Sequence, residues 1–599
     1  MKPVAAAAAA LLLSCLALPG ILPAQARAPD EWLTRAERTG FKETENYEDT
    51  RAYARRLDEA SPWIKLVSFG TSPQGRDLML LVASKDGAFD PAAARATGKP
   101  VVLVQNGIHS GEIEGKDASL MLLRDIAVTR EKAALLDGAI LLVMPLFNVD
   151  GYGGRFGPHT RINQNGPAES GWRTTAQNLN LNRDYMKADA PEMRAWLAVY
   201  DAWQPALLID DHTTDGADFQ YVIGYDMAMR DDAPAPIGAW ARDVFLPYVT
   251  EHVERAGYPT SPYLDLRVPT DPAQGFLSDQ NTARYSTGYT PLRNRPSLLV
   301  ETHMLKPYEP RVRATYETLV AALEVVGREA ARLQEAIRDA EREASGIGRT
   351  AEGDSVTLRL RLADSLGTFH YKGVEWRNEL SEVSGAVRVV YGTKPVELDV
   401  PYQETLVPTL KVRPPLGYLI PPEWSGIADR LRAHGIPVER LETPVRGTFE
   451  VIRISSVKWS EAPFEGRHLL VAGDARRALE PDSLPAGAFW VPLGNAYSRL
   501  TMQLLEPEGP DSFVAWGFFD AIFEDKEYAE DYVMETLARE MLAKDPQLKE
   551  EFEAKVASDS AFRANPAARL EFFYRRTPWW DDRKDRYPVL RVVTPLARP

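Results

Sequence analysis

The sequence predicts an α/β fold with a mixed, mostly parallel sheet flanked by helices, followed by a C-terminal region of mixed α and β structure. Short apolar runs separated by segments of helical periodicity are typical of strands that are buried on both faces of such a sheet. The four runs are KPVVLV (99–104), AILLVMP (139–145), ALLI (206–209) and SLLV (297–300). After residue 353 the pattern changes to alternating and β-branched segments, which indicates a different kind of β structure.

Helical spacing of apolar residues predicts helices between these strands and a second group of elements after them. The first-half helices are expected at 46–56, 119–125 and 312–344; later strands are expected at 356–362, 386–391 and 396–400, and later helices at 426–434 and 528–557. A chain of 599 residues is too long for one hydrophobic core. Because a glycine-containing linker covers 346–353, we expect one domain over 27–345 and an accessory region over 346–599, with room for two subdomains.

The N-terminus has the three parts of a secretory signal peptide. Lys2 precedes an apolar run over residues 4–18, and a small-residue cleavage sequence follows at 24–26. We therefore assign residues 1–26 to a signal peptide and expect a secreted or periplasmic protein. Lipid attachment at Cys15 is the weaker alternative, because apolar sequence continues beyond the cysteine.

Composition excludes several classes of partner and ligand. Two prolines and a glycine interrupt the apolar run within residues 19–23, so no membrane span is expected. The formal net charge of −15 argues against nucleic acid as a partner. Cleavage after Ala26 would also remove the only cysteine, so a metal site would have to use His, Asp and Glu ligands.

Polar residues suited to catalysis follow three of the predicted strands, at 105–112, 210–212 and 301–303. This placement is informative because open α/β sheets gather ligands at the carboxyl ends of their strands. The loop sequence His109-Ser110-Gly111-Glu112 supplies two zinc-ligand types, and its glycine permits a tight turn. The pairing alone is a weak signal, since a chain of this composition contains about one His-x-x-acid motif by chance.

The order of further motifs supplies the missing context. They are Asn148-Val149-Asp150-Gly151-Tyr152, Arg161-Ile162-Asn163-Gln164-Asn165-Gly166, Asn180-Leu181-Asn182-Arg183-Asp184-Tyr185, His212 and Leu298-Leu299-Val300-Glu301. In this order they resemble the M14 family of zinc carboxypeptidases, over about 42–308. The resemblance implies a zinc carboxypeptidase-like catalytic domain in a secreted, zinc-dependent metallocarboxypeptidase, a hydrolase of peptide bonds.

The resemblance also implies the metal ligands and the general base. His109, Glu112 and His212 would bind zinc and leave an open position for water. Glu301 would take the proton from the zinc-bound water and pass it to the leaving amine. A carboxylate held beside such a water is a suitable base.

Three further residues would handle the substrate, a peptide with a free C-terminal carboxylate. By resemblance, Asn182 and Arg183 would hold that carboxylate, and Arg161 would polarise the scissile carbonyl. The chemistry is consistent, because a planar guanidinium matches a carboxylate with two parallel hydrogen bonds.

The sequence departs from the family at several positions. Asn180 stands where the family has an aspartate, so an amide replaces the carboxylate that orients a zinc-bound imidazole. The substrate-capping tyrosine has two candidates, Tyr285 and Tyr289, and we select Tyr289 as substrate-binding. Asp210 and Asp211 precede His212, and one of them is a candidate for orienting that ring.

Two alternative functions stay open. The same ligands and glutamate base resemble related zinc amidohydrolases, either deacylases of N-acyl amino acids or hydrolases of peptidoglycan stem peptides. A catalytically inactive binding module is the alternative from another class. The joint presence of Asn182, Arg183 and Arg161 favours peptides with a free carboxylate, and the presence of Glu301 argues against loss of catalysis.

Overall fold

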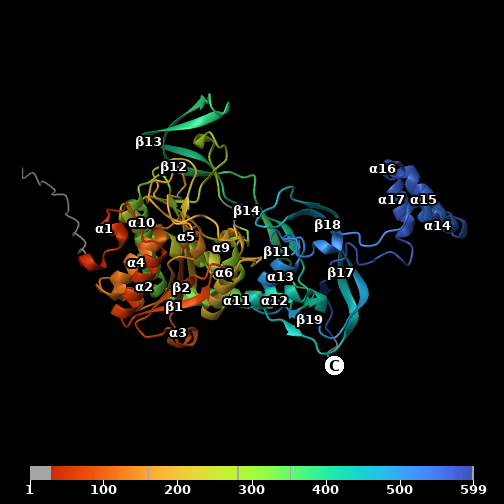
Figure 1. Ribbon diagram of the computed structural model, residues 1–599, viewed down its shortest axis with the longest axis horizontal. Helices are drawn as coiled ribbons and strands as arrows, with labels where there is room; N and C mark the ends of the chain where they lie inside the picture. Colours follow the sequence, from red (N-terminus) through yellow and green to blue (C-terminus); the bar gives the residue numbers. More distant parts are fainter. Residues whose placement is uncertain (1–27, 159–160, 279–281, 351–352, 597–599) are drawn as a thin grey trace, which may run out of the picture.

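The computed structural model describes residues 28–158, 161–278, 282–350 and 353–596 (Figure 1). The predicted signal peptide and Cys15 lie outside these ranges. Within them, no helix combines the length and the apolar character that crossing a membrane requires. The predicted sheet and its helices form one half of the molecule, the C-terminal β structure lies beside them, and a group of small helices lies at the far end (Figure 1).

The central sheet has eight strands in the order β1-β2-β4-β3-β5-β10-β6-β7. Its strands are β1 (Ile64–Thr71), β2 (Asp77–Ala83), β3 (Val101–Asn106), β4 (Ile140–Met144), β5 (Leu207–Thr214), β6 (Ile223–Asp226), β7 (Thr260–Pro262) and β10 (Ser297–His303). The pairs β4–β3, β3–β5, β5–β10 and β6–β7 are parallel, and the other three are antiparallel. The predicted mixed, mostly parallel sheet is therefore confirmed, and all four apolar runs form strands in it.

Helices cover both faces of this sheet, as its apolar strands require. They are α1 (Arg35–Arg38), α2 (Tyr47–Ala60), α3 (Pro91–Thr97), α4 (Glu114–Ala127), α5 (Val149–Gly153), α6 (Pro191–Trp203), α7 (Ala235–Trp240), α8 (Leu246–Arg255), α9 (Ser286–Leu292), α10 (Tyr308–Arg328) and α11 (Ala330–Gly346). Alternate residues of β3 point to opposite faces: Val102 and Val104 pack with α2, α4 and α10, whereas Val101 and Leu103 pack with α3 and α6. The helix predicted over 312–344 is two helices, which break at Glu329.

The C-terminal region is a mixture of strands and helices, as predicted. Its strands are β11 (Val356–Leu362), β12 (Gly367–Leu380), β13 (Val387–Gln403), β14 (Leu406–Val412), β15 (Gly417–Ile420), β16 (Glu439–Arg440), β17 (Val445–Trp459), β18 (Leu470–Leu484), β19 (Phe489–Pro492) and β20 (Leu590–Val592). Its helices are α12 (Ser425–Ala433), α13 (Ser498–Leu505), α14 (Asp531–Lys544), α15 (Pro546–Ser558), α16 (Ser560–Ala564) and α17 (Pro566–Tyr574). The predicted strand at 356–362 is β11, the two runs at 386–400 merge into β13, and the helix predicted over 528–557 breaks before Pro546.

These C-terminal strands form three smaller sheets. A six-stranded sheet has the order β16-β19-β15-β20-β17-β18, and a two-stranded sheet pairs β11 with β14. The third sheet joins β12 and β13 to β9 (Phe276–Leu277) and β8 (Asp265–Leu266) of the first half. The remaining short elements are η1 (Asp30–Trp32), η2 (Ala133–Leu136), η3 (Leu181–Arg183), η4 (Ala241–Phe245), η5 (Pro272–Gln274), η6 (Pro422–Trp424) and η7 (Asp520–Phe523).

The hydrophobic core on the α6 face of the central sheet continues into the C-terminal region. Trp196 and Tyr200 of α6 belong to the same buried cluster as Ile427 and Leu431 of α12. Side chains of β11, β15, β17 and β19 complete this cluster. The division between residues 345 and 346, which we retain as a proposal, therefore does not divide two separate cores.

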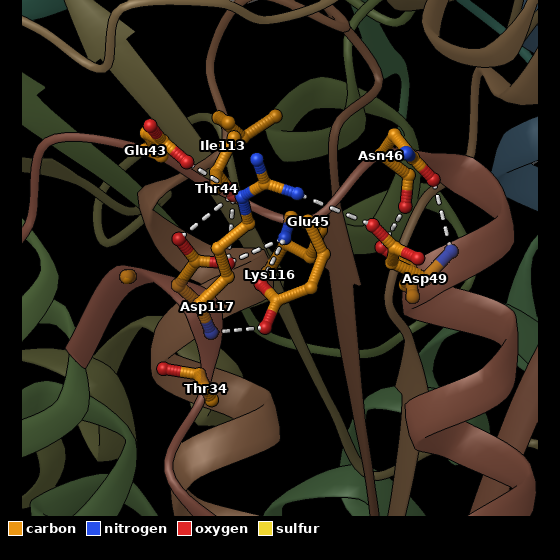
Figure 2. Close-up of polar contacts among 12 residues, drawn as sticks. Thr34, Glu43, Thr44, Glu45, Asn46, Asp49, Ile113, Lys116 and Asp117 are labelled. Atoms are coloured by element: carbon orange, nitrogen blue, oxygen red, sulfur yellow. Dashed lines mark hydrogen bonds and ion pairs between the residues drawn. The ribbon is translucent and has the colours of Figure 1, made fainter. Parts of the chain in front are cut away.

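A buried polar cluster fixes the first turn of α4, which directly follows the predicted ligand loop (Figure 2). Lys116 is fully buried and forms ion pairs with Glu45, at 3.2 Å, and with Asp117. Thr44 and Tyr308 also donate hydrogen bonds to Asp117, from 2.9 and 2.8 Å. Both carboxylates depend on the ammonium group, since a buried charge without a partner is costly.

We predict that Lys116→Met lowers the free energy of unfolding by about 3 to 5 kcal/mol, because it leaves two buried carboxylates without their cation. The matched control is Lys65→Met, which removes an exposed ion pair with Asp58 and should change stability by less than about 1 kcal/mol. Urea unfolding of both variants measures the difference. Equal stability of the two variants would contradict a structural role for the cluster.

Candidate metal centre and active site

Three predicted ligands meet at the carboxyl ends of adjacent strands. His109 and Glu112 lie in the loop between β3 and α4, where the backbone N–H of Glu112 donates to the carbonyl of His109 at 2.9 Å. His212 lies near the end of β5, the parallel neighbour of β3. All three side chains are buried.

The two imidazoles point the same atom at Glu112. The Nδ1 atoms of His109 and His212 lie 3.1 and 2.9 Å from the Oε2 atom of Glu112. One ligand atom from each of the three residues falls within 4.8 Å of the other two. Two imidazole nitrogens and a carboxylate are a donor set of catalytic zinc sites, so the cluster fits a metal site.

The outward-facing nitrogens of both rings lie next to oxygen atoms. His109 Nε2 is 2.9 Å from Asn180 Oδ1, and His212 Nε2 is 3.2 Å from Asp210 Oδ2. Every one of these ring nitrogens faces an oxygen, which can only accept, and a neutral ring carries only one proton; a proton on Nε2 would leave the Nδ1 lone pair for a metal ion. The inward-facing atoms of the cluster are then all electron-pair donors, which a cation would stabilise. Burial lowers the pKa of His109 to about 4, whereas the carboxylates of Asp210 and Glu112 raise the pKa of His212 well above its ordinary value.

The two aspartates before His212 have different surroundings, because successive residues of a strand point to opposite faces. Asp210 lies on the His212 side, where it accepts hydrogen bonds from Gln105 at 2.7 Å and Ser286 at 2.6 Å. Asp211 is buried on the other side, and burial raises its pKa well above the ordinary value. A Cβ atom at Gly115 of α4 would lie 2.5 Å from the Asp211 carboxylate, so only glycine permits this contact. Of the two aspartates, Asp210 is therefore the one whose carboxylate lies next to His212, 3.2 Å from Nε2.

Two arginines bind the remaining oxygen of Glu112. Arg161 donates from Nη2 at 2.6 Å, and Arg173 donates from Nη1 at 2.9 Å. Arg161 also donates to the carbonyl of Thr213 at 2.6 Å. Arg173 was not among the residues predicted from the sequence. The one sequence signal for Arg173 is that it lies, like Arg161, in the segment between the Asn148 and Asn180 motifs.

Glu301 lies beside the cluster because of strand register. It is the direct partner of His212 in the parallel pair β10–β5. Its side chain is partly exposed, and desolvation raises its pKa to about 8. His303, two residues further, instead contacts the carbonyl of Ala217 at 2.7 Å and is fully buried.

The predicted carboxylate anchor lies on η3, the short turn that follows Asn180. The side-chain oxygen of Asn180 accepts from the backbone N–H of Asn182 at 3.0 Å, so this one side chain contacts both the turn and His109. The Arg183 guanidinium stacks on the ring of Tyr285 at 4.3 Å. In the described part of the chain no carboxylate lies within ion-pair distance of Arg183. The structure thus brings Arg183 together with Tyr285.

Tyr289 does not lie in the site, and the prediction that it binds substrate was wrong. Its side chain is fully buried in α9, where its hydroxyl donates to His434 Nδ1 at 2.9 Å and accepts from Arg293 at 3.2 Å. His434 belongs to the C-terminal region. Tyr289 is therefore part of the contact between that region and the central sheet.

The motif at 148–152 has a structural role. Asn148 caps α5 by accepting from the backbone N–H of Gly151 at 3.0 Å. Asp150 accepts hydrogen bonds from Ser72 at 2.7 Å and from Arg76 at 2.8 Å. The motif also contacts the ligand loop over 107–113, because Ser110 of that loop donates a 2.8 Å hydrogen bond to the carbonyl of Asn148. The motif therefore supports the loop that carries His109 and Glu112.

Comparison with known proteins agrees with this geometry. Residues 50–217 match the family model described as zinc carboxypeptidase. "Carboxypeptidase 2" of Trichophyton rubrum is 25% identical over 489 residues, which cover 78% of this chain and 83% of the relative. "Carboxypeptidase 2" of Trichophyton tonsurans is 24% identical over 491 residues, with the same coverage. Alignments of this length extend beyond the predicted catalytic domain into the C-terminal region.

Solved structures of metallo-carboxypeptidases are also similar to part of the chain. The enzyme of Burkholderia cenocepacia is 17% identical with a TM-score of 0.34, covering 47% of this chain and 69% of that chain. The enzyme of Pseudomonas aeruginosa, in complex with (2-guanidinoethylmercapto)succinic acid, is 16% identical with a TM-score of 0.34, covering 48% and 69%.

We predict that zinc affinity depends on Asn180, because it holds the outer nitrogen of His109. Asn180→Ala should weaken zinc binding by about 10- to 100-fold, whereas Asn180→Asp, a stronger acceptor, should strengthen it. His212→Ala should lose zinc altogether. Competition with a chromogenic chelator measures the dissociation constant.

The matched control is Asn178→Asp, the same chemical change at an exposed position two residues away, which should leave zinc affinity unchanged. An Asn180→Ala protein with wild-type zinc affinity, or a His212→Ala protein with full metal content, would contradict this assignment.

Proposed function

Since this chain belongs to the zinc carboxypeptidase family, we propose that it is a metallocarboxypeptidase that removes the C-terminal residue of peptides. The observation that carries the proposal is the position of Arg183. It is a cation without a carboxylate partner among the described residues, on the same short turn that reaches the metal cluster.

We assign the metal to His109, Glu112 and His212. The fit rests on their convergent donor atoms, on the contact of His109 Nε2 with Asn180, and on the Asp210 carboxylate 3.2 Å from His212 Nε2; metal-bound histidines almost always have such outer oxygen neighbours. When bound, zinc supplies Lewis-acid chemistry. The two arginines on Glu112 keep its carboxylate ionised and fix its orientation.

We assign Glu301 as the general base. It accepts a proton from the attacking water and returns it to the leaving amine, a task that requires a carboxylate within reach of both. Its register with His212 supports this assignment. Arg161 donates an N–H to the carbonyl oxygen as negative charge develops there, and Arg173 supplies a second guanidinium at the same edge of the cluster.

Arg183 and Asn182 bind the terminal carboxylate of the substrate in this proposal. Arg183 is partly buried, and two fully buried arginines of this protein are paired internally: Arg293 with Asp201 at 2.7 Å, and Arg311 with Glu114. Among the described residues, Arg183 instead contacts an aromatic ring and its neighbour's carbonyl, and burial lowers its pKa. A desolvated guanidinium without an anion favours an anionic ligand from outside.

We also propose that the enzyme is exported, on the basis of the signal-peptide pattern in residues 1–26. The substrates are then peptides outside the cytoplasm. Mass spectrometry of a peptide library incubated with the enzyme identifies the bond that is cut and distinguishes this function from the deacylase and stem-peptide alternatives.

We predict that Arg183→Ala lowers kcat/KM for peptides with a free C-terminus by at least about thirtyfold, because leaving a desolvated charge unpaired costs about 2 to 5 kcal/mol. Peptides with an amidated C-terminus should be poor substrates for both proteins. The control is Arg342→Ala, which removes an exposed arginine of α11. Equal hydrolysis of free and amidated peptides by the wild-type enzyme would indicate an endopeptidase or an amidase instead.

Glu301→Gln should lower kcat by at least about a hundredfold, since the amide keeps the shape but cannot accept the proton. Zinc content and melting temperature should stay at wild-type values, which excludes a purely structural effect. Glu309→Gln, an exposed change in α10, is the matched control. A folded, zinc-loaded Glu301→Gln enzyme with near wild-type turnover would disprove the assignment.

A further inference from the structure

A loop of the C-terminal region reaches the turn that carries the proposed anchor. Glu465, between β17 and β18, accepts a hydrogen bond through Oε2 from the backbone N–H of Asn180 at 2.7 Å. Asn180 is the same residue whose side chain contacts His109 and the N–H of Asn182. The carboxylate thus fixes the start of η3 from a position 285 residues away in sequence.

Glu465 makes this contact from an unusual backbone conformation. Its φ angle is +52°, in the left-handed region that residues with a Cβ atom rarely adopt. Gly466 follows with a φ of +77°, where glycine is permitted without strain. Residues held in such conformations persist where surrounding contacts determine them, and they cluster at functional sites.

A second carboxylate of the C-terminal region, that of Asp511, fixes the backbone next to Tyr285, the residue whose ring stacks on Arg183. Asp511 accepts from the backbone N–H of Arg284 at 3.0 Å and from its side-chain Nε at 2.6 Å. Arg284 directly precedes Tyr285, whose ring stacks on Arg183. The two sides of the Arg183–Tyr285 pair are therefore each held through a backbone amide by a C-terminal carboxylate.

The loop itself is firmly attached to the first half of the chain. Arg467 forms two hydrogen bonds with the carboxylate of Asp189, at 2.7 and 2.9 Å. The guanidinium of Arg284 lies 5.6 Å from the ring of Phe464 and 5.0 Å from that of Trp516. A bidentate pair and aromatic stacking are specific contacts, so the loop occupies one position relative to the anchor.

We propose that Glu465 and Asp511 are positioning residues of the carboxylate anchor, so that the C-terminal region is part of the active site. The proposal rests on the function proposed above for Arg183. Glu465 acts through the backbone of Asn180 and sets the direction of η3, whereas Asp511 acts through Arg284 and sets the position of Tyr285. Small errors in such a site weaken substrate binding, because the two parallel hydrogen bonds of a guanidinium–carboxylate pair require alignment.

The first test compares Glu465→Ala with Glu465→Gln. Alanine removes the acceptor and should raise KM for free-carboxylate peptides about tenfold, with kcat changed by less than about twofold. Glutamine keeps an oxygen that accepts the same N–H and should restore wild-type KM. Glu461→Ala, an exposed change in the same loop, is the control.

A second measurement avoids catalysis. Calorimetric titration of the metal-free full-length protein with 3-phenylpropionate, a small apolar carboxylate, reports the anchor directly. Its dissociation constant should rise about tenfold in Glu465→Ala and several-fold in Asp511→Asn, which retains one of two acceptor oxygens. The Asp511 variant also keeps the proposal testable if Glu465→Ala does not fold.

Arg183→Ala separates the two proposals. If Arg183→Ala weakens 3-phenylpropionate binding but folded Glu465→Ala and Asp511→Asn do not, the positioning role is disproved. Glutamine as damaging as alanine at position 465 would also disprove it, since the hydrogen bond would then not be the cause. If Arg183→Ala itself leaves binding unchanged, the function proposed for the anchor fails instead.

Discussion

The register of three parallel strands is the constraint on which the rest of the site depends. Asp210 of β5 lies opposite Gln105 of β3, and His212 lies opposite Glu301 of β10. Because the side-chain period of a strand is two, a shift of one residue in either pair would turn these groups to the other face of the sheet. Both faces of β3 and β5 are buried, so a slip would place the polar side chains of these strands against the apolar core on the opposite face.

The same register concentrates charge in a small, desolvated volume. Glu112, Glu301 and Asp210 surround the two imidazoles, and burial by itself disfavours the ionised forms of Glu112 and Glu301. Arg161 and Arg173 compensate only one oxygen of Glu112. The remaining inward-facing atoms are electron-pair donors, and a cation placed among them would remove the repulsion. The metal proposal is thus an electrostatic argument as well as a family resemblance.

The C-terminal region takes part in this arrangement. Its strands and α12 share a hydrophobic core with α6, and its His434 accepts a hydrogen bond from Tyr289 of α9. Its carboxylates at Glu465 and Asp511 bind backbone amides of the first half. The shared hydrophobic core holds the C-terminal region against the first half of the chain. The polar contacts of Glu465 and Asp511 fix the position of the backbone around Arg183 and Tyr285.

The sequence by itself determined what depends on neighbouring residues: the apolar runs that became β3, β4, β5 and β10, and the ordered motifs that indicated the family and the candidate ligands. Only the tertiary structure decided which tyrosine lies at Arg183, that Arg173 reaches Glu112, and that Glu465 holds Asn180. These contacts join residues far apart in the chain. Local patterns set the direction and burial of a segment, whereas the meeting of two segments depends on how the whole core packs.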